Sequence, residues 1–183
     1  MTFFLLFMLA AVSGLVAYIS LQPNTFRIAR SAVFDAPPER IYPEINDFHN
    51  WEKWSPWARL DPDQKTTYDG SPLGAGAILE WSGNNKVGAG KMKIKESSQN
   101  ERVRIKIQFF KPMQAINDVQ FDLKPISETK TEVRWTMSGH NEFVAKAMHA
   151  FMNVDKMVGG QFEQGLANLK AIVEAEPKAL PSG

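Results

Sequence analysis

The hydrophobic positions in the last third of the chain predict one long helix over residues 141–175. Counted at about 100° per residue from Val144, a set of apolar side chains falls within about 40° of a single line. A helix of about 35 residues, about 50 Å long, cannot bury such a stripe on itself and needs a broad apolar surface to lie across. The other members of the stripe are Met148, Phe151, Val158, Phe162, Leu166, Leu169 and Val173.

One charged residue falls inside this stripe. Asp155 lies about 20° from its centre, between Phe151 and Phe162, so its carboxylate is expected to face whatever the helix covers. Two interpretations stay open: a structural aspartate paired in the core, or a polar group placed in a ligand cavity. Gly159 and Gly160 follow, and two glycines inside a helix indicate a bend or the close approach of another backbone.

Alternating apolar and polar residues predict the strands that supply the surface. In residues 102–110, Val103 and Ile105 lie on one face while Arg102 and Arg104 lie on the other. Sequential strands of this kind make an antiparallel meander, whose outer face here opposes basic strands to acidic ones. The other predicted elements are strands at residues 26–35, 77–82, 90–96, 115–123 and 132–137, a short helix at residues 38–45 and a hairpin turn at residues 83–85.

The N-terminal residues 1–21 contain no charged side chain and, as a helix, match the thickness of a bilayer core. An uncleaved single-pass anchor is the favoured interpretation, with a cleaved signal peptide and a buried helix as alternatives. Arginines after the span lean towards a cytoplasmic domain without fixing the side of the membrane. Residues 22–25 then form a linker, residues 26–175 the folded domain and residues 176–183 a disordered tail.

Composition excludes several kinds of chemistry. Lys and Arg number 21 against 20 Asp and Glu, which gives no sign of a nucleic-acid footprint. The chain has no cysteine and three histidines in no ligand-like spacing, so no metal site and no cofactor are expected. Five Trp and twelve Phe instead indicate a large aromatic interior or an aromatic-lined cavity.

This order of elements predicts an α+β fold in which a curved antiparallel sheet wraps around the long C-terminal helix. A curved sheet and a helix seldom close completely, so a pocket is expected between them. Trp54 and Trp57, from a run in which Trp51 also recurs at a spacing of three, are expected at its lip. Its expected walls are Trp81, Met92, Phe109, Asn117, Phe121 and Trp135 from the sheet, and Phe151, Asp155, Val158 and Phe162 from the helix.

Three segments carry a resemblance to a known family: DFHNWEKWSPW at residues 47–57, FFKPMQAINDVQFDL at residues 109–123 and FMNVDKMVGGQFEQGLANLK at residues 151–170. Together with the order of elements, they resemble the START-related helix-grip (SRPBCC) superfamily and, within it, the bacterial polyketide cyclase/dehydrase-like branch. The resemblance implies a deep hydrophobic cavity for lipids, polyketides or similar small molecules. It implies no particular reaction, because one fold hosts many functions.

Three hypotheses for function follow. The first is a membrane-tethered module that binds or transfers a small hydrophobic ligand. The second is an enzyme of the cyclase or dehydratase type, with Asp155 as the candidate acid or base because a carboxyl group desolvated between phenylalanines would have a raised pKa; no catalytic residue is assigned beyond this candidate. The third is an adaptor that binds a protein partner, whose identity the sequence does not indicate.

Overall fold

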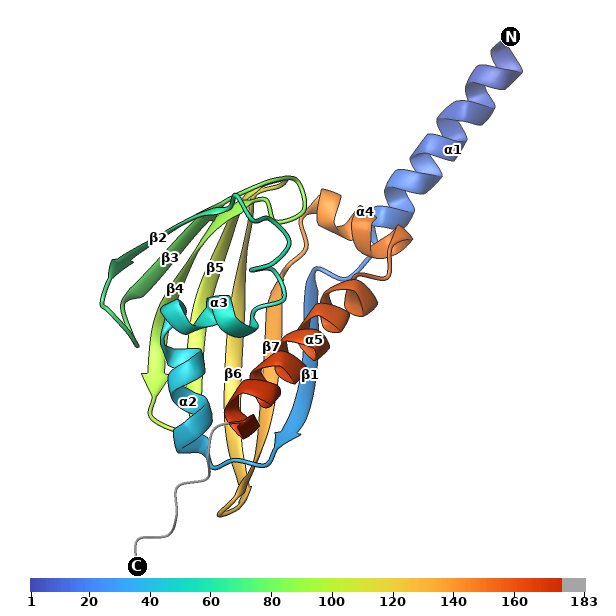
Figure 1. Cartoon of the computed structure of the whole chain (residues 1–183). Helices are drawn as coiled ribbons and strands as arrows, with labels where there is room; N and C mark the ends of the chain where they lie inside the picture. Colours follow the sequence, from blue (N-terminus) through green and yellow to red (C-terminus); the bar gives the residue numbers. More distant parts are fainter. Residues whose placement is uncertain (176–183) are drawn as a thin grey trace, which may run out of the picture.

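The computed structural model describes residues 1–175, and the tail expected at residues 176–183 lies outside the described residues. Helix α1 (Thr2–Ser20) projects from a domain in which helices cover one face of a single sheet (Figure 1). The domain elements are β1 (Thr25–Phe34), α2 (Pro38–Asn46), the 3₁₀ turn η1 (Phe48–Asn50), α3 (Trp51–Trp54), β2 (Lys65–Gly70), β3 (Ala77–Ser82), β4 (Ala89–Ser98), β5 (Arg102–Lys111), β6 (Ala115–Ser127), β7 (Lys130–His140), α4 (Phe143–Phe151) and α5 (Val154–Ala175).

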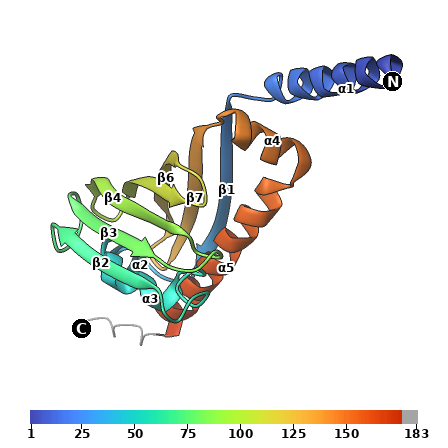
Figure 2. The same cartoon turned by 90° about the horizontal axis from the view of Figure 1, so that it is seen from above.

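The sheet has seven antiparallel strands in the order β1-β7-β6-β5-β4-β3-β2. From β2 to β7 each strand pairs with the next along the chain, which is the predicted meander. Strand β1 pairs with β7 and forms the other edge of the sheet. The sheet curves, and α5 lies along it beside β1 (Figure 2). The α+β helix-grip prediction is therefore confirmed. Strand β2 was not predicted, because its six residues KTTYDG carry one large apolar side chain and lie at an edge.

The two faces of the sheet differ as the alternation predicts. Val103, Phe121 and Val133 are fully buried on the inner face. On the outer face, Arg102 pairs with Asp122 across β5 and β6, with 2.8 Å between Nε and Oδ1. Exposed pairs of this kind contribute about 0–1 kcal/mol each, so they match strand to strand more than they stabilise the fold. The lysines and arginines of β4 and β5 thus belong to an outer surface that also carries acidic residues.

The predicted 35-residue helix is two helices, and this is a correction. Helix α4 ends at Phe151, Met152 takes an extended conformation with φ −125° and ψ 140°, and α5 begins at Val154. Asn153 starts the second helix, because its side-chain oxygen accepts a hydrogen bond from the backbone N–H of Lys156 at 2.9 Å. Because of this break, the side chains of α5 do not point in the directions that a single continuous helix would give them. The apolar stripe therefore holds within α5, at Phe162, Leu166, Leu169 and Val173, which are buried.

Gly159 and Gly160 lie inside α5, which continues through both. A Cβ atom added at Gly160 has no atom within 4 Å, whereas one at Gly159 would lie 2.1 Å from Nη2 of Arg30. The close neighbour at Gly159 is thus the Arg30 side chain of β1. Because glycine has no side chain, the Arg30 guanidinium can pack directly against the backbone of α5.

These two glycines give a matched pair of substitutions. Gly160→Ala is expected to raise the free energy of unfolding by about 0.5–1 kcal/mol, because alanine favours a helix interior and meets no neighbour. Gly159→Ala gains the same propensity but displaces the Arg30 guanidinium, so it is expected to be the less stable of the two. Chemical denaturation followed by circular dichroism would measure both. Equal stability of the two variants would show that the guanidinium moves aside at no cost.

Candidate functional site

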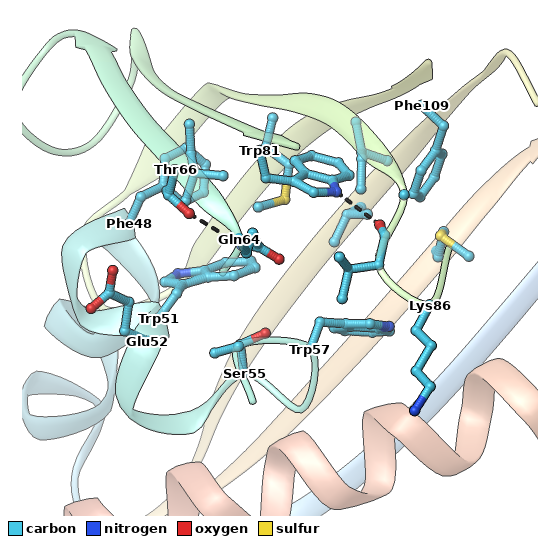
Figure 3. Close-up of a pocket in the computed structure, with 18 of the residues that line it drawn as sticks. Phe48, Trp51, Glu52, Ser55, Trp57, Gln64, Thr66, Trp81, Lys86 and Phe109 are labelled. Atoms are coloured by element: carbon cyan, nitrogen blue, oxygen red, sulfur yellow. Dashed lines mark hydrogen bonds between the residues drawn. The ribbon is translucent and has the colours of Figure 1, made fainter. Parts of the chain in front are cut away.

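A cavity of about 330 Å³ lies between the inner face of the sheet and the helices, within the size range of small-molecule sites. Aromatic and aliphatic side chains make up most of its wall, from β3, β4, β5, β7, α3 and α5. Figure 3 shows Trp51 and Trp57 on one side of this space and Trp81 and Phe109 on the other. Further apolar lining residues are Phe48, Leu79, Met92, Ile107, Val119, Trp135, Met137, Val158 and Phe162.

The run of tryptophans builds the wall opposite the sheet. Asp47 caps η1 by accepting a hydrogen bond from the backbone N–H of His49 at 2.9 Å, which turns the chain into α3. The indole N–H of Trp51 donates to the carbonyl of Ile45 at 3.0 Å, one of the free carbonyls at the end of α2. The indole hydrogen bond and the capped turn together fix the orientation of the Trp51 ring.

Trp135 of β7 is the centre of the aromatic wall. Its ring stacks on Phe162 of α5, with 4.2 Å between ring centroids and 9° between planes, and Trp57 meets it edge-on at 6.0 Å. Helix α5 comes this close because Gly165 has no side chain: a Cβ there would lie 2.7 Å from Trp135 and 3.1 Å from Pro56. The side of the cavity formed by α5 is therefore fixed by aromatic packing.

A few polar groups interrupt the apolar wall. The side-chain amide of Gln64 donates to the hydroxyl of Thr66 at 3.1 Å, and the hydroxyl of Tyr68 donates to Glu52 at 3.3 Å. Desolvation by burial, followed by the charge and hydrogen bond of Glu52, raises the pKa of Tyr68 above its usual value. Tyr68 therefore stays protonated and remains a donor at neutral pH. Within residues 1–175, the buried indole Nε1 of Trp135 has no hydrogen-bond partner.

The rim of the cavity carries two lysines. Lys86 lies in the loop between β3 and β4, and Lys111 ends β5. The indole N–H of Trp81 donates to the carbonyl of Val87 at 3.0 Å and holds this loop against the aromatic wall (Figure 3). Glu52 is the carboxylate among the described lining residues, so the lining has more positive than negative charge.

The structure brings most of the residues predicted for the site together. Trp57, Trp81, Met92, Phe109, Trp135, Val158 and Phe162 all line the cavity. Trp54, Asn117 and Phe121 are buried but lie outside its lining: Trp54, expected at the lip, is 1% exposed in the core. Trp51 takes the wall position instead. The missed residues Gln64, Thr66 and Tyr68 belong to or precede β2, whose sequence gave no strand signal.

Phe151 and Asp155 are not part of the site, which corrects the prediction. Phe151 is 65% exposed at the end of α4. The Asp155 side chain is 61% exposed and pairs with Arg30 of β1, with 2.8 Å between Oδ2 and Nη2. This hydrogen bond lowers the pKa of Asp155, the opposite of the expected rise. The predicted position was wrong because it counted one continuous helix through Met152, and the structure places Asp155 outside the lining of the cavity.

The Arg30 contact predicts a pH dependence. Because the pKa of folded Asp155 is below its unfolded value of about 3.9, the ion pair stabilises the protein above that pH and the contribution is lost as the pH falls below it. Asp155→Asn is therefore expected to lower the melting temperature at pH 7, with the difference shrinking below about pH 4. Thermal melts across this range, with the exposed Asp63→Asn as control, would test it. A difference between Asp155→Asn and the native chain that stays constant with pH would contradict it.

Two further features bear on function. Helix α1 is 19 residues long with a mean hydropathy of 2.3 and is almost fully exposed, so it is long and apolar enough to cross a membrane; a signal sequence has the same properties. Among the residues that the structure describes, no three His, Asp or Glu side chains are grouped to hold a metal ion.

Comparisons with known proteins agree with this geometry. Residues 25–174 match the family described as polyketide cyclase / dehydrase and lipid transport. The fold is similar to protein CV1439 from Chromobacterium violaceum (21% identity, TM-score 0.58, covering 84% of this chain and 99% of that one). It is also similar to the Aha1 dimer from Colwellia psychrerythraea (19%, 0.59, 84% and 99%) and to protein MLL2253 from Mesorhizobium loti (15%, 0.61, 84% and 100%). No curated protein matches the chain. At these identities, the solved structures establish the fold alone.

Proposed function

Because the chain belongs to the polyketide cyclase/dehydrase and lipid transport family, we propose that it binds or transfers a small hydrophobic molecule between its sheet and α5 while tethered to a membrane by α1. The observation that carries this proposal is the cavity of about 330 Å³ walled by aromatic side chains. An apolar hollow of this size leaves its lining without contacts on one side, and a ligand of matching shape restores them. The family match supports a hydrophobic ligand for this space.

The lining also supports a ligand with polar atoms. Small-molecule sites place a few polar groups in a mostly apolar wall, and these groups fix the orientation of the ligand. Gln64, Thr66 and Tyr68 offer such groups along one wall. The ligand class favoured is therefore a mainly apolar molecule with one or two oxygen atoms, such as a fatty acyl or polyketide chain.

The tether is supported by how α1 meets the domain. The ammonium group of Lys146 in α4 donates to the carbonyl of Ser20 at the end of α1, at 3.0 Å. The side-chain amide of Asn141 donates to the carbonyl of Pro23 in the following linker, at 3.1 Å. A folded domain that holds the end of this helix favours an anchor that stays attached over a signal that is removed. A tether raises the effective concentration of the domain near molecules dissolved in the lipid.

Native mass spectrometry of the full chain, released gently from detergent, tests the proposal. The expected spectrum shows one small apolar molecule bound per chain, with the bound fraction restored in stripped protein by added palmitic acid. A spectrum of ligand-free protein alone, unchanged by palmitic acid or by a long-chain alcohol, would contradict it.

A further inference from the structure

Strand register places several distant segments at one end of the sheet. Thr25, where β1 begins, pairs with His140, where β7 ends, so α1 and α4 leave the sheet at this end. Ala89 pairs with both Ser82 and Lys111, which brings the β3–β4 loop and the β5–β6 turn to the same end. We call it the α1 end. Figure 1 shows α4 and these turns at the end of the domain from which α1 projects.

Exposed apolar side chains gather at the α1 end. Large apolar residues scattered singly over a surface are ordinary, but a contiguous group marks a contact surface. At the opposite end of the sheet, exposed apolar residues such as Leu73 and Ile126 are isolated. The group at the α1 end comprises Phe110, Met113, Phe143, Val144, Phe151 and Met152, each between 37% and 65% exposed.

Helix α4 has the form of a helix that lies in a membrane interface. None of its nine residues is buried, although most are apolar, and it is packed against the end of α1. Lys146 is among its polar residues and reaches the last turn of α1. A lysine beside apolar residues suits the boundary between lipid headgroups and acyl chains, where the ammonium group stays in the polar layer.

The lining of the cavity reaches this same end. Asn85, Lys86 and Gly88 of the β3–β4 loop, with Lys111 and Pro112 of the β5–β6 turn, all belong to its lining. The part of the lining at the α1 end therefore carries two lysines suited to anionic headgroups, at the same end of the sheet as the exposed apolar group.

We infer that the α1 end is a membrane-docking surface, which rests on the bilayer entered by α1 and turns the mouth of the cavity towards the lipid. The occupant of this surface is the lipid bilayer itself, because α4, which carries part of the apolar group, packs against a helix of membrane-spanning length. This inference rests on the proposed function, since it gives the route by which a lipid-dissolved ligand reaches the cavity without crossing water.

Site-specific fluorescence tests the inference, and the absence of native cysteine makes single labels simple. Phe151→Cys and Met113→Cys at the α1 end, and Ile126→Cys as an exposed control at the opposite end, would each carry an environment-sensitive NBD label. The full chain is reconstituted in vesicles of phosphatidylcholine and phosphatidylglycerol containing spin-labelled lipid. The expected result is at least twofold quenching of the labels at residues 151 and 113, with the label at residue 126 unchanged.

Two results would overturn the inference. Equal quenching at all three positions would show a domain that tumbles freely on its tether. Rapid disulfide formation between unlabelled Phe151→Cys chains, with no quenching of the label, would assign the surface to a second copy of the chain. Failure of the proposed function is distinguishable, because it would leave the quenching intact while native mass spectrometry in detergent found no bound molecule.

Discussion

Trp54→Ala is expected to lower the free energy of unfolding by about 3–5 kcal/mol, the range for removing a large aromatic side chain from a packed core. Trp54 is 1% exposed and its ring lies among Trp51, Phe121 and Trp135, at centroid distances of 4.8, 6.1 and 5.7 Å. Its indole N–H also donates to the carbonyl of Glu44 at 3.1 Å, joining α3 to α2. The substitution therefore removes packing and a hydrogen bond together.

The matched control for this prediction is Trp57→Ala. Trp57 belongs to the same run of tryptophans but is half-buried at the cavity wall. Compared with Trp54→Ala, Trp57→Ala is therefore expected to lower the free energy of unfolding less and the affinity for the ligand more. Denaturation in mild detergent, followed by far-ultraviolet circular dichroism, compares the two. A Trp54→Ala variant within about 1 kcal/mol of the native chain, or less affected than Trp57→Ala, would contradict the assignment of Trp54 to the core.

The second large expected effect is a loss of ligand binding when a larger side chain fills the cavity. Ile107 of β5 lines the hollow and pairs with Met92 on β4 and Asn117 on β6, in the middle of the sheet. Ile107→Trp places a large ring where the ligand is proposed to lie, so the affinity for palmitic acid is expected to fall at least tenfold, equivalent to about 1.4 kcal/mol. Overpacking carries its own cost of about 1–3 kcal/mol if the ring cannot enter the hollow.

The control makes the same chemical change elsewhere. Ile126 of β6 is 56% exposed at the far end of the sheet, and Ile126→Trp should leave the bound fraction unchanged. Native mass spectrometry with palmitic acid measures both variants, and circular dichroism shows that each is folded. Met137→Trp, from β7, provides a second filling variant should the first fail to fold. A folded filling variant that binds as the native chain does would place the ligand outside the cavity.

Sequence reasoning predicted the sheet well because its strands alternate strictly. Val103, Ile105 and Phe121 fall on the buried face, and the outer face pairs Lys106 with Asp118 as the charges suggest. Two-residue periodicity is a local property, and burial of one face fixes it. Edge strand β2 escaped notice because Thr66 and Tyr68 line a cavity instead of filling a core, so their pattern is weak.

The candidate site was predicted less well, for a reason visible at Asn153. Met152 and Asn153 lie between the two helices, and the extended backbone at Met152 changes the direction in which every later side chain points. Asp155 therefore lies on the surface beside Arg30 instead of on the predicted inner line. The signal was present, since asparagine is a strong helix N-cap, but an apolar stripe that continues across the break hides it. Long-range partners such as Arg30, 125 residues from Asp155, leave no local pattern in the sequence.

Locating a bound molecule tests the central claim most directly. A fatty acid carrying a diazirine group on its chain would be added to the full protein in detergent and activated by light, and the labelled peptides would be identified by mass spectrometry. The account predicts adducts on cavity residues of β4, β5 and β7, such as Met92, Ile107 and Met137, that excess palmitic acid abolishes. Adducts confined to α1 and α4, with none on the inner face of the sheet, would contradict it.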